Sequence, residues 1–479
     1  MNEVVIIGAG PAGLAAALSA SAIGGRVVVL DASDDVGGQY WRHLPPERPS
    51  ERESLLHHGW ATFQRMRGAI AADPNCTIVT SAHVWAIDRG AVHVLVGEAD
   101  GSNREARVYR PDALVLATGA FDRTLPVPGW DLPGVFTAGG AQALAKGERV
   151  AVGEHVVVAG AGPFLLAVAA SVVATGATVV GVYEASRAAR LVRHWAARPW
   201  ELAATPAKAR ELVGYAAVLA RHRIAYVPGH AVTAIEGRDR VESVTVSTLD
   251  GSWRPIKGSE RQLEVDAVCL GHGFTPRLEL ALAAGCRLND GRFVEVDAEQ
   301  RTSVASVFAA GEITGIGGVD LALAEGAIAG YVAAGGRLSD ASLRVELIRR
   351  RVLRRFAQRL ARAHVIGENW ATWLSDETIV CRCEDVSVAD LTAATSATRS
   401  SGLRSLKLVS RAGLGPCQGR VCGRTVEALL SARAPEGGLG GASTDRRPIA
   451  MPIRLGELAG GQNVEAGIPV KGQGSWMST

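Results

Sequence analysis

The sequence lacks a strong charge of either sign. Its 51 lysine and arginine residues face 48 aspartate and glutamate residues, which leaves a formal net charge of only +3. Such a balance provides no global field that would attract nucleic acid or an anionic membrane. A nucleic-acid-binding function is therefore disfavoured, while a protein partner stays open.

Cysteine is also scarce, with seven residues in 479. An odd number at low density does not suit a secreted disulfide scaffold and suits a reducing cytosol. No basic segment precedes the first apolar run, so no secretory signal is expected and cytoplasm is the predicted location. Two charge-free runs, Val4 to Gly25 and Val156 to Tyr183, are interrupted by glycine-rich turns. Each predicts a buried strand, a turn and a helix rather than a membrane span.

The first of these runs carries a dinucleotide-binding fingerprint. Gly8, Gly10 and Gly13 follow an apolar strand in G-x-G-x-x-G spacing. The first permits a sharp turn, the second lets the backbone approach a pyrophosphate, and the third lets the helix pack closely on the sheet. The next strand ends in Asp31, where a carboxylate accepts the hydroxyls of an adenosine ribose. An ordinary βαβ turn without a ligand is the alternative.

The second run repeats the strand and turn with an incomplete fingerprint. Gly160 and Gly162 are present, but Leu165 stands at the third glycine position, so tight helix packing must be arranged differently. The following strand ends in Glu184, which favours a free ribose 2′-hydroxyl and hence NAD over NADP. The open alternatives are a bound adenine nucleotide, with or without hydride transfer, and a degenerate domain kept for packing.

Residues 1 to 335 contain no Cys-x-x-Cys pair. Cys76, Cys269 and Cys286 are isolated there, and we expect them to be small buried hydrophobic residues. Disulfide-reducing chemistry beside a flavin is therefore disfavoured.

The other four cysteines form a cluster near the C-terminus. Cys381 and Cys383 make a C-x-C pair, and Cys417 and Cys422 make a C-x₄-C pair. Four thiolates can hold an iron–sulfur cluster or zinc. Because C-x-C is an unusual spacing for structural zinc, a 2Fe-2S cluster is favoured, with zinc and metal-free thiols as alternatives.

The surroundings of these cysteines also bear on a cluster. Gly413, Gly415 and Gly419 allow backbone amides to turn toward sulfur, and such hydrogen bonds tune the potential of a cluster. Three basic residues could offset its negative charge or belong to a solvated surface: Lys407, Arg411 and Arg420.

An arginine-rich helix is predicted from residue 344 to 362. Ile348, Val352, Phe356 and Leu360 recur every four residues and predict one apolar stripe. We expect the basic face to be solvated, with a partner or anionic lipid as the alternative.

Three further segments resemble the flavoproteins with two dinucleotide-binding domains. Gly37-Gly38-Gln39-Tyr40-Trp41-Arg42 is similar to a turn on the flavin side of FAD, and 114–120 and 307–312 are similar to the strands that leave and re-enter the FAD domain. The family's usual aspartate is here Glu312, one methylene longer. The resemblance implies FAD contacts at Gly8, Gly10, Pro11, Ala12, Gly13, Asp31, Ala32, Gly38, Gln39, Arg42, Val84, Ala117, Thr118, Gly119, Gly311 and Glu312.

The C-terminal cysteines resemble the 2Fe-2S domain of bacterioferritin-associated ferredoxin. The whole order of motifs resembles the A or alpha subunits of heteromeric amine and amino-acid dehydrogenases: the octopine, nopaline, hydroxyproline, proline and hydrogen cyanide synthase types. This implies an electron-transfer subunit beside a second flavoprotein of the D-amino-acid-oxidase or sarcosine-oxidase type, with or without a small ferredoxin-like subunit. The alternatives are a stand-alone NADH-dependent flavin reductase and a non-enzymatic scaffold.

The predicted fold class is α/β, with two nested Rossmann-like domains of the glutathione and thioredoxin reductase type and a small helical cluster domain. The length predicts two to four compact units. The expected FAD domain comprises 1–122 and 271–335, the second dinucleotide domain 123–270, the arginine-rich linker 336–374, the 2Fe-2S domain 375–434, and a linker with a tail 435–479.

Overall fold

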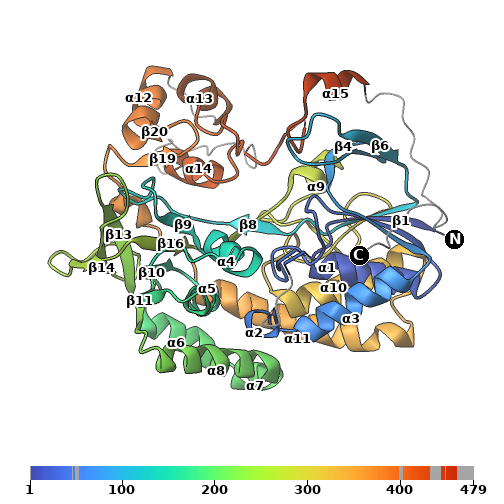
Figure 1. The fold of residues 1–479 in the computed structure, drawn as a ribbon, viewed down its shortest axis with the longest axis horizontal. Helices are drawn as coiled ribbons and strands as arrows, with labels where there is room; N and C mark the ends of the chain where they lie inside the picture. Colours follow the sequence, from blue (N-terminus) through green and yellow to red (C-terminus); the bar gives the residue numbers. More distant parts are fainter. Residues whose placement is uncertain are drawn as a thin grey trace. The chain divides into compact units, whose positions relative to one another are not determined.

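The computed structural model describes residues 2–45, 47–48, 53–398, 403–431, 444–447 and 449–460. The chain divides into two compact units, each assembled from segments that are distant in sequence. Unit 1 comprises residues 1–120, 276–357 and 445–479, and unit 2 comprises 121–275 and 358–444 (Figure 1). Most of the predicted linker and tail, namely 435–443, 448 and 461–479, lies outside the described residues, as do 432–434 at the end of the predicted 2Fe-2S domain.

Unit 1 is built on a parallel five-stranded sheet in the order β18-β7-β1-β2-β3. Parallel strands are buried on both faces, which explains why these strands read as continuous apolar runs. A second, antiparallel sheet contains β4, β5 and β6. The strands are β1 (Glu3–Ile7), β2 (Arg26–Leu30), β3 (Cys76–Val79), β4 (Ala82–Asp88), β5 (Ala91–Val96), β6 (Glu105–Tyr109), β7 (Ala113–Leu116) and β18 (Val307–Ala309). The helices are α1 (Pro11–Ser21), α2 (Glu53–Leu56), α3 (Trp60–Ala72), α9 (Glu279–Ala283), α10 (Val319–Ala333), the 3-10 turn η1 (Ala341–Leu343) and α15 (Leu455–Gly460).

Two helices of unit 1, α1 and α10, cross at very close range because glycines line the contact. A Cβ built on Gly326 would lie 2.0 Å from the carbonyl oxygen of Ala12, and one on Gly330 would lie 2.0 Å from that of Ala16. No side chain can be accommodated at such distances. The glycines of α10 therefore allow it to lie directly against the helix that follows the first glycine turn.

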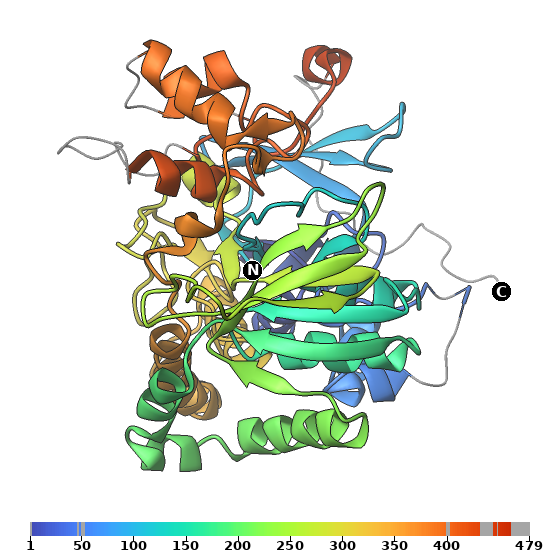
Figure 2. The same cartoon turned by 90° about the vertical axis from the view of Figure 1, so that its left-hand side faces the viewer.

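Unit 2 repeats the parallel architecture with the order β12-β11-β10-β16-β9, next to the antiparallel sheet β13-β14-β15 (Figure 2). Its strands are β9 (Val135–Thr137), β10 (His155–Gly160), β11 (Thr178–Glu184), β12 (Tyr226–Pro228), β13 (His230–Glu236), β14 (Ser243–Thr248), β15 (Arg261–Glu264), β16 (Ala267–Gly271), β19 (Ile379–Cys381) and β20 (Val386–Ser387). Its helices are α4 (Ala138–Gly147), α5 (Phe164–Ala174), α6 (Ala188–Ala196), α7 (Pro199–Ala203), α8 (Pro206–Arg221), η2 (Trp370–Trp373), α12 (Val388–Thr398), α13 (Leu403–Ser410) and α14 (Gly423–Ser431). Short strands β8 (Ala120–Asp122) and β17 (Phe274–Pro276) pair where the chain passes between the units.

The cysteine region shares one hydrophobic core with the second dinucleotide domain. Trp253 stacks on Trp373, with ring centroids 5.8 Å apart, and the Trp373 indole N–H donates to the Trp253 carbonyl at 2.7 Å. Trp130 belongs to the same core, together with buried residues of β19, α12, α13 and α14. The helices around the cysteines are thus packed on the second dinucleotide domain within unit 2.

Helix α11 (Arg344–Ala363) forms where the sequence predicts it, but the predicted apolar stripe is wrong at Ile348, which is 58% exposed. The buried positions of α11 include two arginines, Arg350 and Arg359, beside Leu353. The apolar spacing is a poor guide to burial here, because hydrogen-bond partners inside the protein satisfy the guanidinium groups of these arginines. The expectation of a wholly solvated basic face is therefore also wrong.

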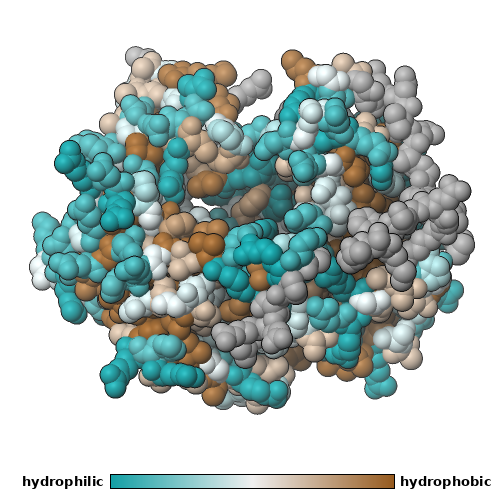
Figure 3. All heavy atoms as spheres, viewed as in Figure 1, coloured by the Kyte–Doolittle hydropathy of each residue, from teal (hydrophilic) through white to brown (hydrophobic). Residues whose placement is uncertain are grey.

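Among the described helices, none combines the length and the apolar character needed to cross a membrane. On the face drawn in Figure 3, hydrophilic residues cover most of the surface and smaller apolar areas lie between them.

Candidate flavin and cluster sites

The first glycine turn in unit 1 has the geometry of a phosphate cradle. Gly8 has φ +108°, and a Cβ on it would lie 2.3 Å from the carbonyl oxygen of Ala117. A Cβ on Gly13 would lie 1.7 Å from the Gly8 carbonyl oxygen. Gly10 faces open space, since the nearest atom to its Cβ position is the Cα of Gly38 at 3.9 Å. The open face lies at the N-terminus of α1, where backbone N–H groups attract phosphate.

Asp31 lies directly after β2, beside this turn. Its carboxylate accepts hydrogen bonds from the backbone N–H of Ala9 at 2.5 Å and of Ser33 at 2.8 Å. The side chain is partly exposed. A carboxylate offers about four lone-pair directions, so about two stay available for the hydroxyls of a ribose.

The other residues predicted to contact FAD surround the same end of the sheet. Gly38 has φ +60°, and a Cβ there would come within 2.9 Å of the Cα of Gly10, into the cradle. The Ala117 N–H donates to the Ile7 carbonyl at 2.9 Å, which holds the segment 117–119 at the end of β7. Ala32 and Gln39 are exposed, Pro11, Arg42, Thr118 and Gly119 are partly exposed, and Ala12 is buried. The side chain of Val84 is buried within β4, and its contact with FAD stays a prediction.

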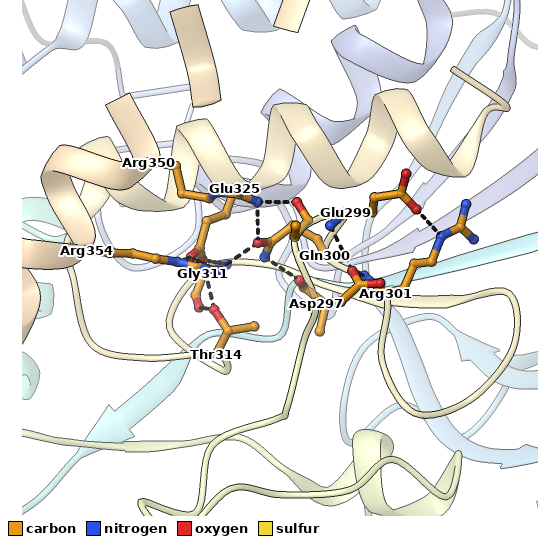
Figure 4. Close-up of polar contacts among 11 residues, drawn as sticks. Asp297, Glu299, Gln300, Arg301, Gly311, Thr314, Glu325, Arg350 and Arg354 are labelled. Atoms are coloured by element: carbon orange, nitrogen blue, oxygen red, sulfur yellow. Dashed lines mark hydrogen bonds and ion pairs between the residues drawn. The ribbon is translucent and has the colours of Figure 1, made fainter. Parts of the chain in front are cut away.

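The returning segment after β18 is anchored by a residue that the sequence motifs do not reveal. The backbone N–H of Gly311 donates to Glu325 Oε2 at 3.2 Å, and the Thr314 hydroxyl donates to the same oxygen at 2.8 Å (Figure 4). Glu325 lies on α10 and is 2% exposed. Glu312, which stands at the position of the family's usual aspartate, follows Gly311 and is half-buried. Its contact with FAD stays a prediction.

Arginines of α11 complete this network. Arg354 donates to Glu325 Oε1 at 2.9 Å and to the Gln300 side-chain oxygen at 2.8 Å, and Arg350 donates to the same oxygen at 3.1 Å (Figure 4). The sign in the sequence is Glu325 itself, an acid placed among the apolar residues of α10. Such a residue requires a buried partner, but the sequence does not say which arginine supplies it.

The second glycine turn, in unit 2, is tight as well. Gly160 has φ +146°, and its Cβ would lie 1.7 Å from the carbonyl oxygen of Gly271. Leu165 occupies the third glycine position and is buried. A Cβ on Gly271 would lie 3.6 Å from Leu165 and 2.7 Å from the Ala138 Cβ, so this glycine makes room on the neighbouring strand. No atom of the described residues lies within 4 Å of a Cβ on Gly162.

The acid of this second domain differs from Asp31. Glu184 is fully buried, and it accepts the N–H of Gly162 at 2.8 Å and of Ser186 at 2.9 Å. The Nδ1 atom of His364 lies 3.3 Å from its Oε2. Burial alone would raise the pKa of Glu184, but His364 and the two N–H donors outweigh burial and lower it.

The four predicted ligand cysteines interact as two pairs in unit 2. All four thiols are free; the Cys422 thiol hydrogen-bonds to Cys381, and Cys383 interacts with Cys417. The hydrogen bond from Cys422 lowers the pKa of Cys381 to about 6 against burial, and the Gly413, Cys383 and Glu384 backbone N–H groups contribute. Among the described residues, no three His, Cys, Asp or Glu side chains already stand at positions where they could hold one metal ion.

The loop around these thiols fits a compact cluster. Gly413 and Gly419 have φ +83° and +77°, conformations that favour glycine, and the Gly413 N–H donates toward Cys381. A Cβ on Gly415 would lie 2.3 Å from the Cβ of Cys383, so only glycine fits there. A 2Fe-2S cluster needs two thiolates on each iron, and four cysteines in two close pairs supply that number. The three isolated cysteines are buried, at 0 to 4% exposure, which confirms the prediction for Cys76, Cys269 and Cys286.

Comparison with known proteins agrees with both sites. The pyridine nucleotide-disulphide oxidoreductase family matches residues 2–329, and the BFD-like 2Fe-2S binding domain matches residues 379–432. The A subunit of opine oxidase from Rhizobium meliloti is 32% identical over 95% of this chain and 87% of its own length. The chain belongs to the family of opine oxidase A subunits. It is accordingly an FAD-dependent oxidoreductase subunit with a 2Fe-2S domain.

Other relatives of the opine oxidase A subunits extend this result. Hydrogen cyanide synthase subunit HcnB of Pseudomonas protegens is 30% identical over 87% of this chain and 89% of its own length. The crystal structure of L-proline dehydrogenase from P. horikoshii is 21% identical, covers 95% of this chain and 79% of its own, and has a TM-score of 0.63. That likeness confirms the predicted fold class.

Proposed function

We propose that this chain carries electrons from a separate flavoprotein subunit through its own FAD and 2Fe-2S cluster to an acceptor. The partner, of the D-amino-acid-oxidase or sarcosine-oxidase type, would oxidise the C–N bond of an amino acid or imino acid, such as an opine, proline or hydroxyproline. The observation that carries the proposal is the presence of both redox sites in one chain of the opine oxidase A family. A cytoplasmic location and a small ferredoxin-like third subunit belong to the same proposal.

The chemistry of unit 1 supports a carrier of electrons. FAD supplies two-electron chemistry and can release electrons singly to an iron–sulfur cluster. Residues 1–335 hold no Cys-x-x-Cys pair, and Cys76, Cys269 and Cys286 are buried and unsuited to disulfide exchange. The protein's part is to bind the flavin, with Asp31 for the ribose and the Gly10 turn for the phosphates.

The surroundings of the cysteines support an exit for electrons at the surface of unit 2. Cys383 is exposed, whereas Cys381 and Cys422 are buried. The guanidinium of Arg382 lies over the Trp130 ring at 5.3 Å, and Arg411 donates to Glu384 at 2.5 Å. A cluster held by Cys383 would thus have one edge close to solvent, where an acceptor can approach.

The test is co-expression of this chain with an amino-acid-oxidase-like flavoprotein encoded beside it. In the purified complex, anaerobic addition of the partner's substrate should bleach this chain's FAD and produce the reduced-cluster signal in electron paramagnetic resonance. A Cys383→Ser variant should lose the cluster signal, whereas Cys286→Ala, which changes a cysteine outside the cluster, should keep it. Full substrate oxidation by the isolated chain would contradict the proposal.

A further inference from the structure

The carboxylate of Glu184, which should recognise a nucleotide ribose, is surrounded by groups of its own chain. It accepts the Gly162 and Ser186 N–H groups, and His364 Nδ1 lies 3.3 Å from Oε2. Tyr226 is 38% exposed overall, and burial of its hydroxyl together with the nearby Glu184 carboxylate raises the pKa of that hydroxyl. The two N–H groups take two of the about four lone-pair directions, and the buried His364 imidazole blocks the approach of ribose hydroxyls to the fully buried carboxylate.

The equivalent acid of unit 1 serves as an internal reference. Asp31 also accepts two backbone N–H groups near its glycine turn, but it is partly exposed. The two sites therefore share the strand, the turn and the acid. They differ in what covers the acid: the imidazole of His364 and the Tyr226 hydroxyl at Glu184, and solvent at Asp31.

The segment that carries His364 is fixed in place within unit 2. The Arg359 guanidinium donates to the carbonyl oxygen of Trp195 at 2.8 Å and to the Glu201 carboxylate at 2.9 Å, and it is 6% exposed. The Arg190 guanidinium donates to the carbonyl oxygen of Arg362 at 3.0 Å. Residues 358–364, which we call the closing segment, are thereby tied to α6 and α7.

We propose that His364 closes the second nucleotide site from within the chain, so that this domain takes up a nicotinamide dinucleotide only when the closing segment is displaced. The imidazole, with Nδ1 3.3 Å from Glu184 Oε2, occupies the place beside the carboxylate where a ribose hydroxyl would have to lie. The turn at Gly162 stays open to phosphate, so the parts of a binding site are present beneath the closing segment. The inference concerns binding alone and does not depend on the proposed electron transfer.

The experiment measures NADH binding to the purified FAD-loaded chain by calorimetry, for the wild type and for His364→Ala. Enzymes typically have KM values of about 1 μM to 1 mM for their substrates. We expect no saturable binding by the wild type up to about 1 mM, and saturable binding by His364→Ala. The gained binding should favour NADH over NADPH, because Glu184 disfavours a 2′-phosphate. His222→Ala, an exposed histidine of the same unit, should behave as the wild type.

A second variant keeps the test decisive if His364→Ala does not fold. Arg359→Ala releases the closing segment without changing the nucleotide site, and it should give a smaller gain in NADH affinity. Saturable binding of NADH by the wild type at the affinity of the variants would overturn the proposal. So would folded variants that gain nothing. Neither result would bear on whether a partner flavoprotein reduces the FAD.

Discussion

The buried carboxylate of Glu325 offers the sharpest test of how the flavin site is held. We predict that Glu325→Gln both destabilises unit 1 and weakens FAD binding. The amide keeps the size of the side chain but loses the negative charge that pairs with Arg354 at 2.8 Å. The amide also carries an N–H₂ group, which is a donor and cannot accept the hydrogen bonds that the Gly311 N–H and the Thr314 hydroxyl donate at this position.

The magnitude follows from the burial of the two partners. Removing one member of a fully buried ion pair costs about 3–5 kcal/mol. The Arg354 side chain is 36% exposed, so water compensates part of this loss. Each weakened hydrogen bond to Gly311 and Thr314 adds about 1 kcal/mol. With about 1–2 kcal/mol from the partly screened ion pair and about 2 kcal/mol from the two hydrogen bonds, we expect a loss of about 3–4 kcal/mol in the free energy of unfolding, and a rise of about tenfold in the FAD dissociation constant.

Urea unfolding followed by flavin fluorescence measures the first quantity, and titration of the apoprotein with FAD measures the second. The matched control is Glu299→Gln in the same network, where Glu299 and Arg301 are 35% and 46% exposed and lie 2.7 Å apart. An exposed pair contributes about 0–1 kcal/mol, so this variant should bind FAD normally. Equal effects of the two substitutions, or an unchanged FAD affinity in Glu325→Gln, would refute the reasoning.

Three further predictions concern other parts of the chain. Cys417→Ser should lower iron and sulfide content while FAD is retained, because the two cofactors belong to different units; simultaneous loss of FAD would contradict that division. Gly330→Ala should destabilise the protein by more than about 2 kcal/mol by overpacking, because its Cβ would lie 2.0 Å from the Ala16 carbonyl oxygen. Gly214→Ala, where no described atom lies within 4 Å of the new Cβ, should instead stabilise α8 by about 0.5–1 kcal/mol. Thermal unfolding of the two variants should show these opposite shifts. Burial, helped by a nearby arginine, lowers the pKa of His272 from 6.5 to about 3. Because the unfolded chain then binds a proton that the folded chain cannot, stability should fall by about 1.4 kcal/mol per pH unit below about pH 6.5. Urea unfolding at pH 7 and pH 5 should show a weaker pH dependence of stability for His272→Asn than for the wild type. An equal pH dependence in the two proteins would exclude His272 as the cause.

The sequence by itself determined those features that depend on a few neighbouring residues. The turns at Gly8 and Gly160, the strands that end at Asp31 and Glu184, and the 2Fe-2S cysteines were predictable because local spacing determines turn geometry and ligand type. Leu165 also signalled correctly that the second helix packs differently. These patterns were sufficient for the fold class and both cofactors.

The tertiary structure alone decided which charged groups face one another. Nothing near Glu325 in sequence shows that Arg354 pairs with it, and the spacing in α11 suggested instead that Ile348 would be buried. Likewise, Glu184 and Asp31 look equivalent in sequence, yet His364 covers only the first. The physical reason is that a carboxylate has few lone-pair directions, and folding, which brings distant segments together, determines which donors occupy them.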